Sequence, residues 1–264
     1  MKASAPLALL ALCLTSPAHA ASSQWFEMEG ARIRLLSTGN ADAEGVLRGT
    51  LDIELKPGWK TYWRDPGAAG VPPQIGFEGS ENVHSVSLDF PPPAWHDDGF
   101  SKWAGYDRPV RLPLSIKLAE ATAPARLSTQ LFLGICKQIC IPVQASLDLV
   151  PGEDTDSAED TEAVQAAWAA LPAPASASFG LTPVAGGAAD HITVQAALPG
   201  TVDSEVFVAS ADGYALGLPK RDPAEPKRFS IEIVDHPATR PDGPGLPYTL
   251  VTAEGAVSGY LPYP

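Results

Sequence analysis

Short segments in which hydrophobic and polar residues alternate run along most of the chain. In residues 46–55, four apolar residues at positions 47, 51, 53 and 55 alternate with polar residues at 48, 50, 52 and 54. A period of two predicts a half-buried strand, with one face in a core and the other toward solvent. Further strands are predicted at residues 31–36, 83–90, 110–118, 126–133, 143–147, 191–198, 206–208, 229–233 and 248–251.

Proline and glycine separate these segments. The chain has 27 prolines and 23 glycines, many of them clustered in turns such as residues 56–58, 65–67 and 91–93. Short strands at regular spacing with this punctuation are typical of an all-β sandwich.

One segment has helical periodicity instead. Residues 157–171 place Val164, Trp168 and Leu171 on one face, and Ser157 can cap the first turn. A proline follows directly, within a linker rich in Pro, Ala and Ser. We therefore predict two β-domains, residues 21–151 and 179–264, joined by an acidic loop, a short helix and a Pro/Ala-rich linker at 152–178.

The first twenty residues have the anatomy of a secretory signal. A lysine precedes the apolar run 7–14, and Ala18-His-Ala20 matches a cleavage site. The run is too short to cross a bilayer as a helix. We predict cleavage after Ala20 and a periplasmic location. A lipoprotein anchor at Cys13 is the alternative, although Leu12 stands where a small residue is expected.

The charge of the chain narrows the choice of partners. The formal net charge is −13, so the protein repels nucleic acid and anionic lipid. We expect neither as a partner, and no later segment is apolar enough for us to expect membrane insertion.

Cys136 and Cys140 are the only cysteines outside the signal segment. In an oxidising compartment two thiols this close tend to pair, which predicts a Cys136–Cys140 disulfide. On an extended strand their Cα atoms would lie about 13 Å apart, whereas a disulfide needs about 5.5 Å. The chain must turn between them, and strands on both sides favour a hairpin over a helical turn.

This disulfide closes a very short loop. The stabilisation from a disulfide grows with loop length, so the bond contributes little to folding. That favours a bond that is made and broken in thiol–disulfide exchange. Two alternatives remain open: a static structural disulfide in a non-catalytic interaction module, and a copper-handling site in which both thiolates bind Cu(I). We expect no cofactor and no bound metal, although His84 or His96 could approach the thiolates in the fold.

Aromatic residues crowd residues 95–106. One interpretation is an exposed loop whose hydrophobic tip covers the disulfide until a partner arrives, because exposed rings usually have a role. The other is that Trp95, Trp103 and Tyr106 fill the core. Phe100, which follows two aspartates and a glycine, is the best candidate for the tip.

With these residues in view, the chain resembles a known family. The motif Trp95-His-Asp-Asp-Gly-Phe100, residues 105–108 and 112–114, and the cysteine pair with Pro142 are similar to the N-terminal periplasmic domain of the thiol–disulfide interchange protein DsbD. Residues 56–67 and 80–82 look more like its relatives in the ScsB group. The resemblance covers about residues 24–150; the second half resembles ScsB-like proteins only loosely.

The resemblance implies an immunoglobulin-like fold and a cysteine pair that shuttles between dithiol and disulfide. A membrane electron-conducting protein or a thioredoxin-like protein would supply reductant for periplasmic substrates, with roles such as cytochrome maturation or copper tolerance. We expect activity of the protein-disulfide reductase type that depends on such partners. Because this chain contains neither a membrane conduit nor a thioredoxin-like domain, we expect both to be separate proteins.

The resemblance also suggests roles for individual residues. Phe100 matches the phenylalanine of a cap over the active site, with Asp98 beside it. Tyr62 or Trp63 matches a tyrosine that lines the site, and we include Trp103 and Tyr106 in the same lining. Cys140 is expected to attack the oxidised substrate and Cys136 to resolve the mixed disulfide. Two features depart from the family: DsbD has a wider gap between its cysteines, and Ser101-Lys102 does not follow its pattern.

Overall fold

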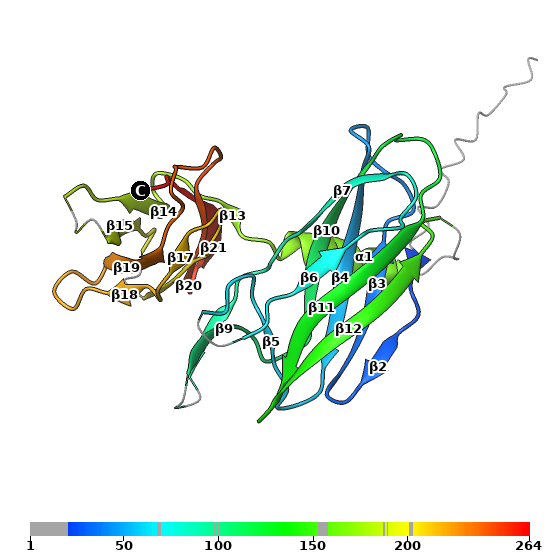
Figure 1. Ribbon diagram of the computed structural model, residues 1–264, viewed down its shortest axis with the longest axis horizontal. Helices are drawn as coiled ribbons and strands as arrows, with labels where there is room; N and C mark the ends of the chain where they lie inside the picture. Colours follow the sequence, from blue (N-terminus) through cyan, green and yellow to red (C-terminus); the bar gives the residue numbers. More distant parts are fainter. Residues whose placement is uncertain are drawn as a thin grey trace, which may run out of the picture.

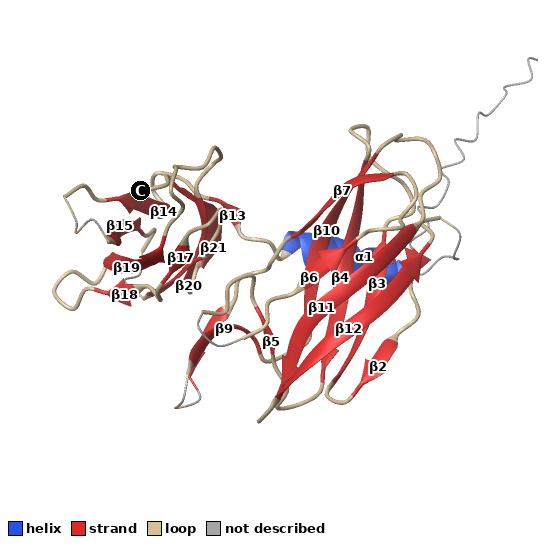
Figure 2. Ribbon diagram, in the orientation of Figure 1, coloured by secondary structure: helices blue, strands red, loops and turns tan. Residues whose placement is uncertain are grey.

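The structure is a computed structural model that describes residues 21–67, 70–97, 99, 101–152, 158–186, 188, 190–200 and 203–264. Within these residues the chain is almost entirely β, with one helix, α1 (Ala158–Ala169). The two β-rich bodies and the helix are seen in Figure 2. The predicted all-β class is therefore confirmed. The predicted signal at 1–20 and the capping residue Ser157 lie outside the described residues.

The larger body packs two antiparallel sheets against each other. The six-stranded sheet runs β1 (Ala21–Ser22), β3 (Ala31–Ser37), β4 (Val46–Leu55), β10 (Val110–Leu118) and β7 (Val83–Leu88), with β2 (Phe26–Met28) beside β3. The three-stranded sheet runs β12 (Cys140–Leu149), β11 (Leu127–Cys136) and β6 (Gln74–Gly76). Alternate residues of both sheets, such as Leu51, Leu112 and Leu133, fill one core between them.

The outer face of β4 differs from the expectation for a half-buried strand. Thr50 and Asp52 are 0% and 1% exposed, so the prediction of a solvent-facing polar side is wrong here. The cause is α1, which lies over this face: the Trp168 indole donates a hydrogen bond to the Gly49 carbonyl at 3.1 Å, and Val164 packs against Leu36. A helix was predicted at these positions, but the surface that it covers was not.

Asp52 becomes a buried charge under this helix. Arg34 and Arg111 approach its two carboxylate oxygens at 3.6 and 3.4 Å, and Arg34 also pairs with Asp160 of α1 at 3.0 Å. Burial nevertheless raises the pKa of Asp52, because desolvation outweighs the attraction of the two guanidinium groups. Asp52 of β4 is therefore linked to α1 through Arg34, which contacts both Asp52 and Asp160.

The second body is a smaller sandwich. One sheet runs β13 (Ala173–Pro174), β21 (Gly255–Leu261), β20 (Leu246–Thr252) and β16 (Ser204–Val208). The other runs β14 (Gly180–Pro183), β15 (His191–Ala197), β19 (Arg228–Asp235) and β17 (Ala215–Leu216), with β18 (Lys220–Arg221) beside β19. Val194, Ile231 and Leu250 lie in its separate core. The fold class of two β-sandwiches joined by a short helix is confirmed.

A third, small sheet lies between the two bodies (Figure 1). It runs β5 (Thr61–Tyr62), β9 (Lys102–Tyr106) and β8 (Ala94–Asp97). The aromatic segment, for which an exposed loop and core packing were both considered, forms a hairpin, and its Trp103 and Tyr106 are buried, as the core interpretation expects. No helix in the described part of the chain has the length and apolar character needed to cross a membrane.

Candidate redox site

The two cysteines close the β11–β12 hairpin. The strands pair without a break from Leu127 opposite Leu149 to Cys136 opposite Cys140, and residues 137–139 form the tip. The predicted hairpin is thus confirmed, with the cysteines on adjacent strands at its end. The structure joins them in a disulfide.

Hydrogen bonding explains why these two positions are so close. The backbone N–H and C=O of Cys136 both pair with Lys60, at 2.9 and 2.8 Å, on the side away from Cys140. Cys136 and Cys140 therefore form a non-hydrogen-bonded antiparallel pair, in which the Cα atoms approach to about 4.5 Å. Their Cα–Cα distance is 4.1 Å, and both side chains lie on the same face.

The two cysteines differ strongly in exposure. Cys136 is 1% exposed because the segment around Lys60 and Tyr62 covers it, whereas Cys140 is exposed. The tip beside Cys140 is open as well, with Ile139 79% exposed. A second protein can reach this disulfide from the Cys140 side.

An aromatic wall stands against the disulfide, formed by Tyr62 and Trp103. The Tyr62 hydroxyl lies 3.1 Å from the Cys140 Sγ, and the Trp103 ring meets the Tyr62 ring edge to face at 5.6 Å. Both rings pack with Cys136 in one buried cluster. Of the two candidates at 62 and 63, Tyr62 is the residue beside the sulfur. Trp63 lies in the sandwich core instead, 5.7 Å from Phe207.

Two glycines and one threonine hold the wall in place. The Thr61 hydroxyl donates a hydrogen bond to the Gly134 carbonyl at 3.0 Å, which ties β5 to β11. A Cβ on Gly134 would lie 3.1 Å from the Tyr62 ring, and one on Gly105 would lie 2.3 Å from the Thr61 carbonyl oxygen. The absence of side chains at these two positions lets β5 fit between β9 and β11.

Polar groups adjoin the aromatic wall. The Lys60 ammonium lies 4.4 Å from the centre of the Trp103 ring, and the His96 ring stacks on Trp103 at 4.1 Å. Lys137 is exposed on the hairpin tip. Sequence reasoning missed Lys60, although its place two residues before Tyr62 in a short strand points its side chain to the same face.

The remaining predicted site residues lie elsewhere. Tyr106 is buried, and its hydroxyl donates to the Pro91 carbonyl at 2.8 Å; burial raises its pKa well above the usual value. Asp98 and Phe100, the predicted cap, lie outside the described residues, so their role stays a prediction. Among the described residues, no three or more His, Cys, Asp or Glu side chains form a group able to hold a metal ion.

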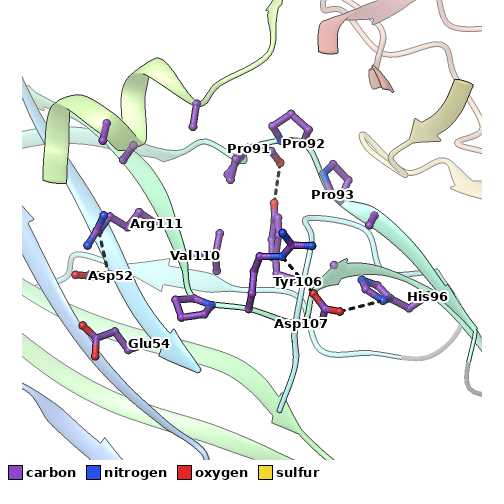
Figure 3. Close-up of a pocket in the computed structure, with 17 residues that line it drawn as sticks. Asp52, Glu54, Pro91, Pro92, Pro93, His96, Tyr106, Asp107, Val110 and Arg111 are labelled. Carbon is purple, nitrogen blue, oxygen red and sulfur yellow. Dashed lines mark hydrogen bonds and ion pairs between the residues drawn. The ribbon is translucent and has the colours of Figure 1, made fainter. Parts of the chain in front are cut away.

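A cavity of about 610 Å³, lined in part by Tyr106, lies between α1, the proline run 91–93 and β10 (Figure 3). Its charges largely compensate one another: Arg111 pairs with Asp52, and Asp107 lies near both Arg108 and His96. The lining contains neither cysteine. The chemistry of the site therefore belongs to the hairpin end and not to this cavity.

Comparisons with known proteins show what this chain is similar to. Residues 34–151 match the family described as thiol:disulfide interchange protein DsbD, N-terminal. The crystal structure of the N-terminal periplasmic domain of ScsB from Proteus mirabilis is similar, with a TM-score of 0.70 and 21% identity over 90% of this chain and 96% of that one. At this identity the likeness shows the fold, and it extends over both sandwiches. Among curated proteins, none matches this chain.

Proposed function

Since residues 34–151 belong to the family of DsbD N-terminal domains, whose chemistry is thiol–disulfide interchange, we propose that the chain relays reducing equivalents in the periplasm through Cys136 and Cys140. The observation that carries the proposal is the asymmetry of the disulfide, which joins an exposed cysteine, Cys140, to a buried one, Cys136. A purely structural disulfide has no need of an exposed sulfur beside a tyrosine hydroxyl.

The reaction proceeds through mixed disulfides. In the reduced protein the Cys140 thiolate attacks a substrate disulfide, bonds to one substrate sulfur and releases the other as a thiolate. The Cys136 thiolate then attacks the Cys140 sulfur, releases the second substrate thiolate and restores the Cys136–Cys140 bond. Two electrons pass to the substrate, and the chain ends oxidised.

The Tyr62 hydroxyl fits the needs of this cycle. It donates a hydrogen bond to the Cys140 sulfur whenever that sulfur carries negative charge, both as attacking thiolate and as leaving group. The buried Cys136 cannot meet a bulky substrate first, but it lies on the facing strand and needs only a small movement to resolve the mixed disulfide.

The return of electrons needs a donor dithiol. We propose a membrane electron-conducting protein or a thioredoxin-like periplasmic protein, which attacks the exposed Cys140 sulfur and leaves with the disulfide. Oxidised periplasmic proteins, including those of cytochrome maturation or copper tolerance, are the proposed recipients. In this scheme the chain is an intermediate carrier of the protein-disulfide reductase type, without a cofactor.

The test is a redox titration of the protein against thiol–disulfide buffers, with free thiols counted by alkylation and mass. We expect a midpoint clearly above about −300 mV, in the range of labile, exchangeable pairs. A midpoint well below that value would mark a structural disulfide and overturn the proposal. The double variant Cys136→Ser/Cys140→Ser gives the baseline for alkylation.

A further inference from the structure

Two buried residues at the end of β16, Phe207 and the following Ala209, are part of the core of the first sandwich. Phe207 on β16 is 0% exposed and packs within the first core. Its neighbours Val206 and Val208 lie in the second core. Because successive side chains of a strand point to opposite faces, β16 serves both sandwiches: its even positions belong to the second and Phe207 reaches into the first.

Phe207 contacts the β8–β9 hairpin, which carries Trp103, one of the two rings of the aromatic wall. Its ring stacks on Trp95 of β8, with centroids 4.8 Å apart and planes 15° from parallel, and the Trp95 indole donates to the Val206 carbonyl at 3.2 Å. Trp95 pairs with Ala104 of β9, and the next pair along is His96 with Trp103. The contact made by the second sandwich is thus one residue pair away from the ring that packs on Tyr62.

Two further contacts hold the segment that follows Tyr62, the other ring of the aromatic wall. Asp65, three residues after Tyr62, accepts a hydrogen bond from the Ser210 backbone N–H at 2.7 Å. Two residues further, Gly67 lies against Leu218, so closely that a Cβ there would be 2.9 Å from the leucine methyl. The second sandwich therefore holds both β8 and the segment that leaves β5.

We infer that the second sandwich sets the aromatic wall against the disulfide, with Trp95 and Phe207 as positioning residues. The inference rests on the proposed redox function and gives the C-terminal domain a part in it. While the wall is held, Cys136 stays covered and the Tyr62 hydroxyl stays at the Cys140 sulfur. Exchange is thereby restricted to Cys140. When the contact is loosened, the wall separates from the disulfide and both sulfurs become accessible.

The experiment uses the full chain throughout and the variant Phe207→Leu, which keeps an apolar side chain but removes the flat ring. Two readouts are followed: the rate at which dithiothreitol reduces the disulfide, and the order in which iodoacetamide alkylates the two thiols of the reduced protein, mapped by peptide mass. In the parent protein we expect Cys140 to react first. In Phe207→Leu we expect reduction to be about two- to tenfold faster, the factor that corresponds to an aromatic pair, and Cys136 to react in the folded protein.

The control is Ile231→Ala, which opens a cavity in the second core without touching the first. It lowers stability but should leave both the rate and the order of alkylation unchanged. Asp65→Asn provides an independent variant, because the two carboxylate oxygens accept from the Ser210 and Gly67 N–H groups, and an asparagine has one accepting oxygen for these two donors. It should shift both readouts in the direction of Phe207→Leu, and it keeps the test valid if the core variant folds poorly.

Equal behaviour of Phe207→Leu, Asp65→Asn and the parent protein would overturn the inference, and so would an equal change in Ile231→Ala. Failure of the proposed function is distinguishable. In that case the parent disulfide resists thiol buffers, yet a phosphine still reduces it, and the order of alkylation still reports whether the second sandwich positions the wall.

Discussion

At the scale of single residues, the proposed roles of the two cysteines rest on their unequal exposure. The hairpin places both side chains on one face, but the segment at Lys60 and Tyr62 covers only Cys136. The open tip leaves Cys140 in contact with solvent. We therefore propose that an incoming sulfur meets Cys140 before Cys136.

The single cysteine variants test this division of roles. Cys136→Ser keeps the attacking thiol and lacks the resolving one, so we expect it to accumulate a mixed disulfide with an oxidised substrate protein. Cys140→Ser should form none, because its remaining thiol is buried. Non-reducing electrophoresis and intact mass measure the trapped species. If Cys140→Ser is the variant that traps, the two roles are reversed.

Tyr62→Phe tests the hydroxyl at the Cys140 sulfur. Removing the donor from a thiolate destabilises it by about 1.5 kcal/mol, close to one unit on the pH scale. The midpoint of the alkylation-rate profile of Cys140, measured in a Cys136→Ser background, should therefore move about one unit toward higher pH. The rate at pH 7 should fall only about threefold, because a more basic thiolate is also a better nucleophile.

Tyr106→Phe is the matched control for Tyr62→Phe. It removes a buried tyrosine hydroxyl that bonds to Pro91, away from the disulfide. It should lower the melting temperature and leave the alkylation profile in place. An equal shift in both variants would show that the effect comes from general loosening and not from the hydrogen bond at the sulfur.

The sequence predicted the cysteine pair, the hairpin and the redox chemistry, because two cysteines four residues apart leave few geometries. It could not decide between Tyr62 and Trp63. They lie at the end of a two-residue strand, and a shift of one position reverses the face to which a side chain points. Only the pairing of Tyr62 with Gly105 settles which ring meets the sulfur. The cap role of Asp98 and Phe100 stays a prediction.

At the scale of secondary-structure elements, most strands were predictable and their partners were not. Residues 46–55 and 110–118 were expected as strands and are β4 and β10 with the same bounds. Their alternating pattern says nothing about what covers the outer face, where α1 buries Thr50 and Asp52. The burial of Trp103 and Tyr106 was one of the two interpretations considered for the aromatic segment, but the pairing of β8 with β9 was not predicted.

Gly134→Ala tests how tightly β5 and β11 are fitted. The new methyl group would lie 3.0 Å from the Val71 Cβ and 3.1 Å from the Tyr62 ring, both closer than ordinary contacts. We expect a loss of about 1–3 kcal/mol in the free energy of unfolding, together with faster reduction of the disulfide, because a displaced Tyr62 no longer covers it. Chemical denaturation and the rate of reduction measure the two effects.

Gly76→Ala on the neighbouring strand β6 is the control for this change. Its methyl group would meet mainly the mobile end of the Glu78 side chain, which can move aside. Stability and exchange rate should both stay close to those of the parent protein. If both alanine variants behave alike, the close packing of Tyr62 on Gly134 has no bearing on the site.

At the scale of the whole molecule, the chain joins two sandwiches through more than its linker. We propose the division at residues 152–178 as the domain boundary, as composition suggests. Yet the helix within it packs on the first sandwich, through Trp168 and Val164. Phe207 crosses the boundary in the other direction. Amino-acid composition can indicate a linker between two domains. It does not indicate which residues distant in the sequence will be in contact in the fold.

These contacts predict that the two sandwiches unfold together. All six tryptophans lie at or before residue 168, so tryptophan fluorescence reports on the first sandwich, its helix and the contact of Trp95 with Phe207, and not on the core of the second sandwich. Ile231→Ala, in the core of the second sandwich, should cost about 2–5 kcal/mol and lower the melting temperature by about 5–15 °C. Because Phe207 couples the two cores, the melting temperature seen by fluorescence should fall by the same amount as the one seen by circular dichroism.

Ile139→Ala, at the exposed hairpin tip, is the control and should change neither melting temperature. A fluorescence transition that stays in place while a second, earlier transition appears would mean that the sandwiches are independent, and that the second one cannot hold the aromatic wall.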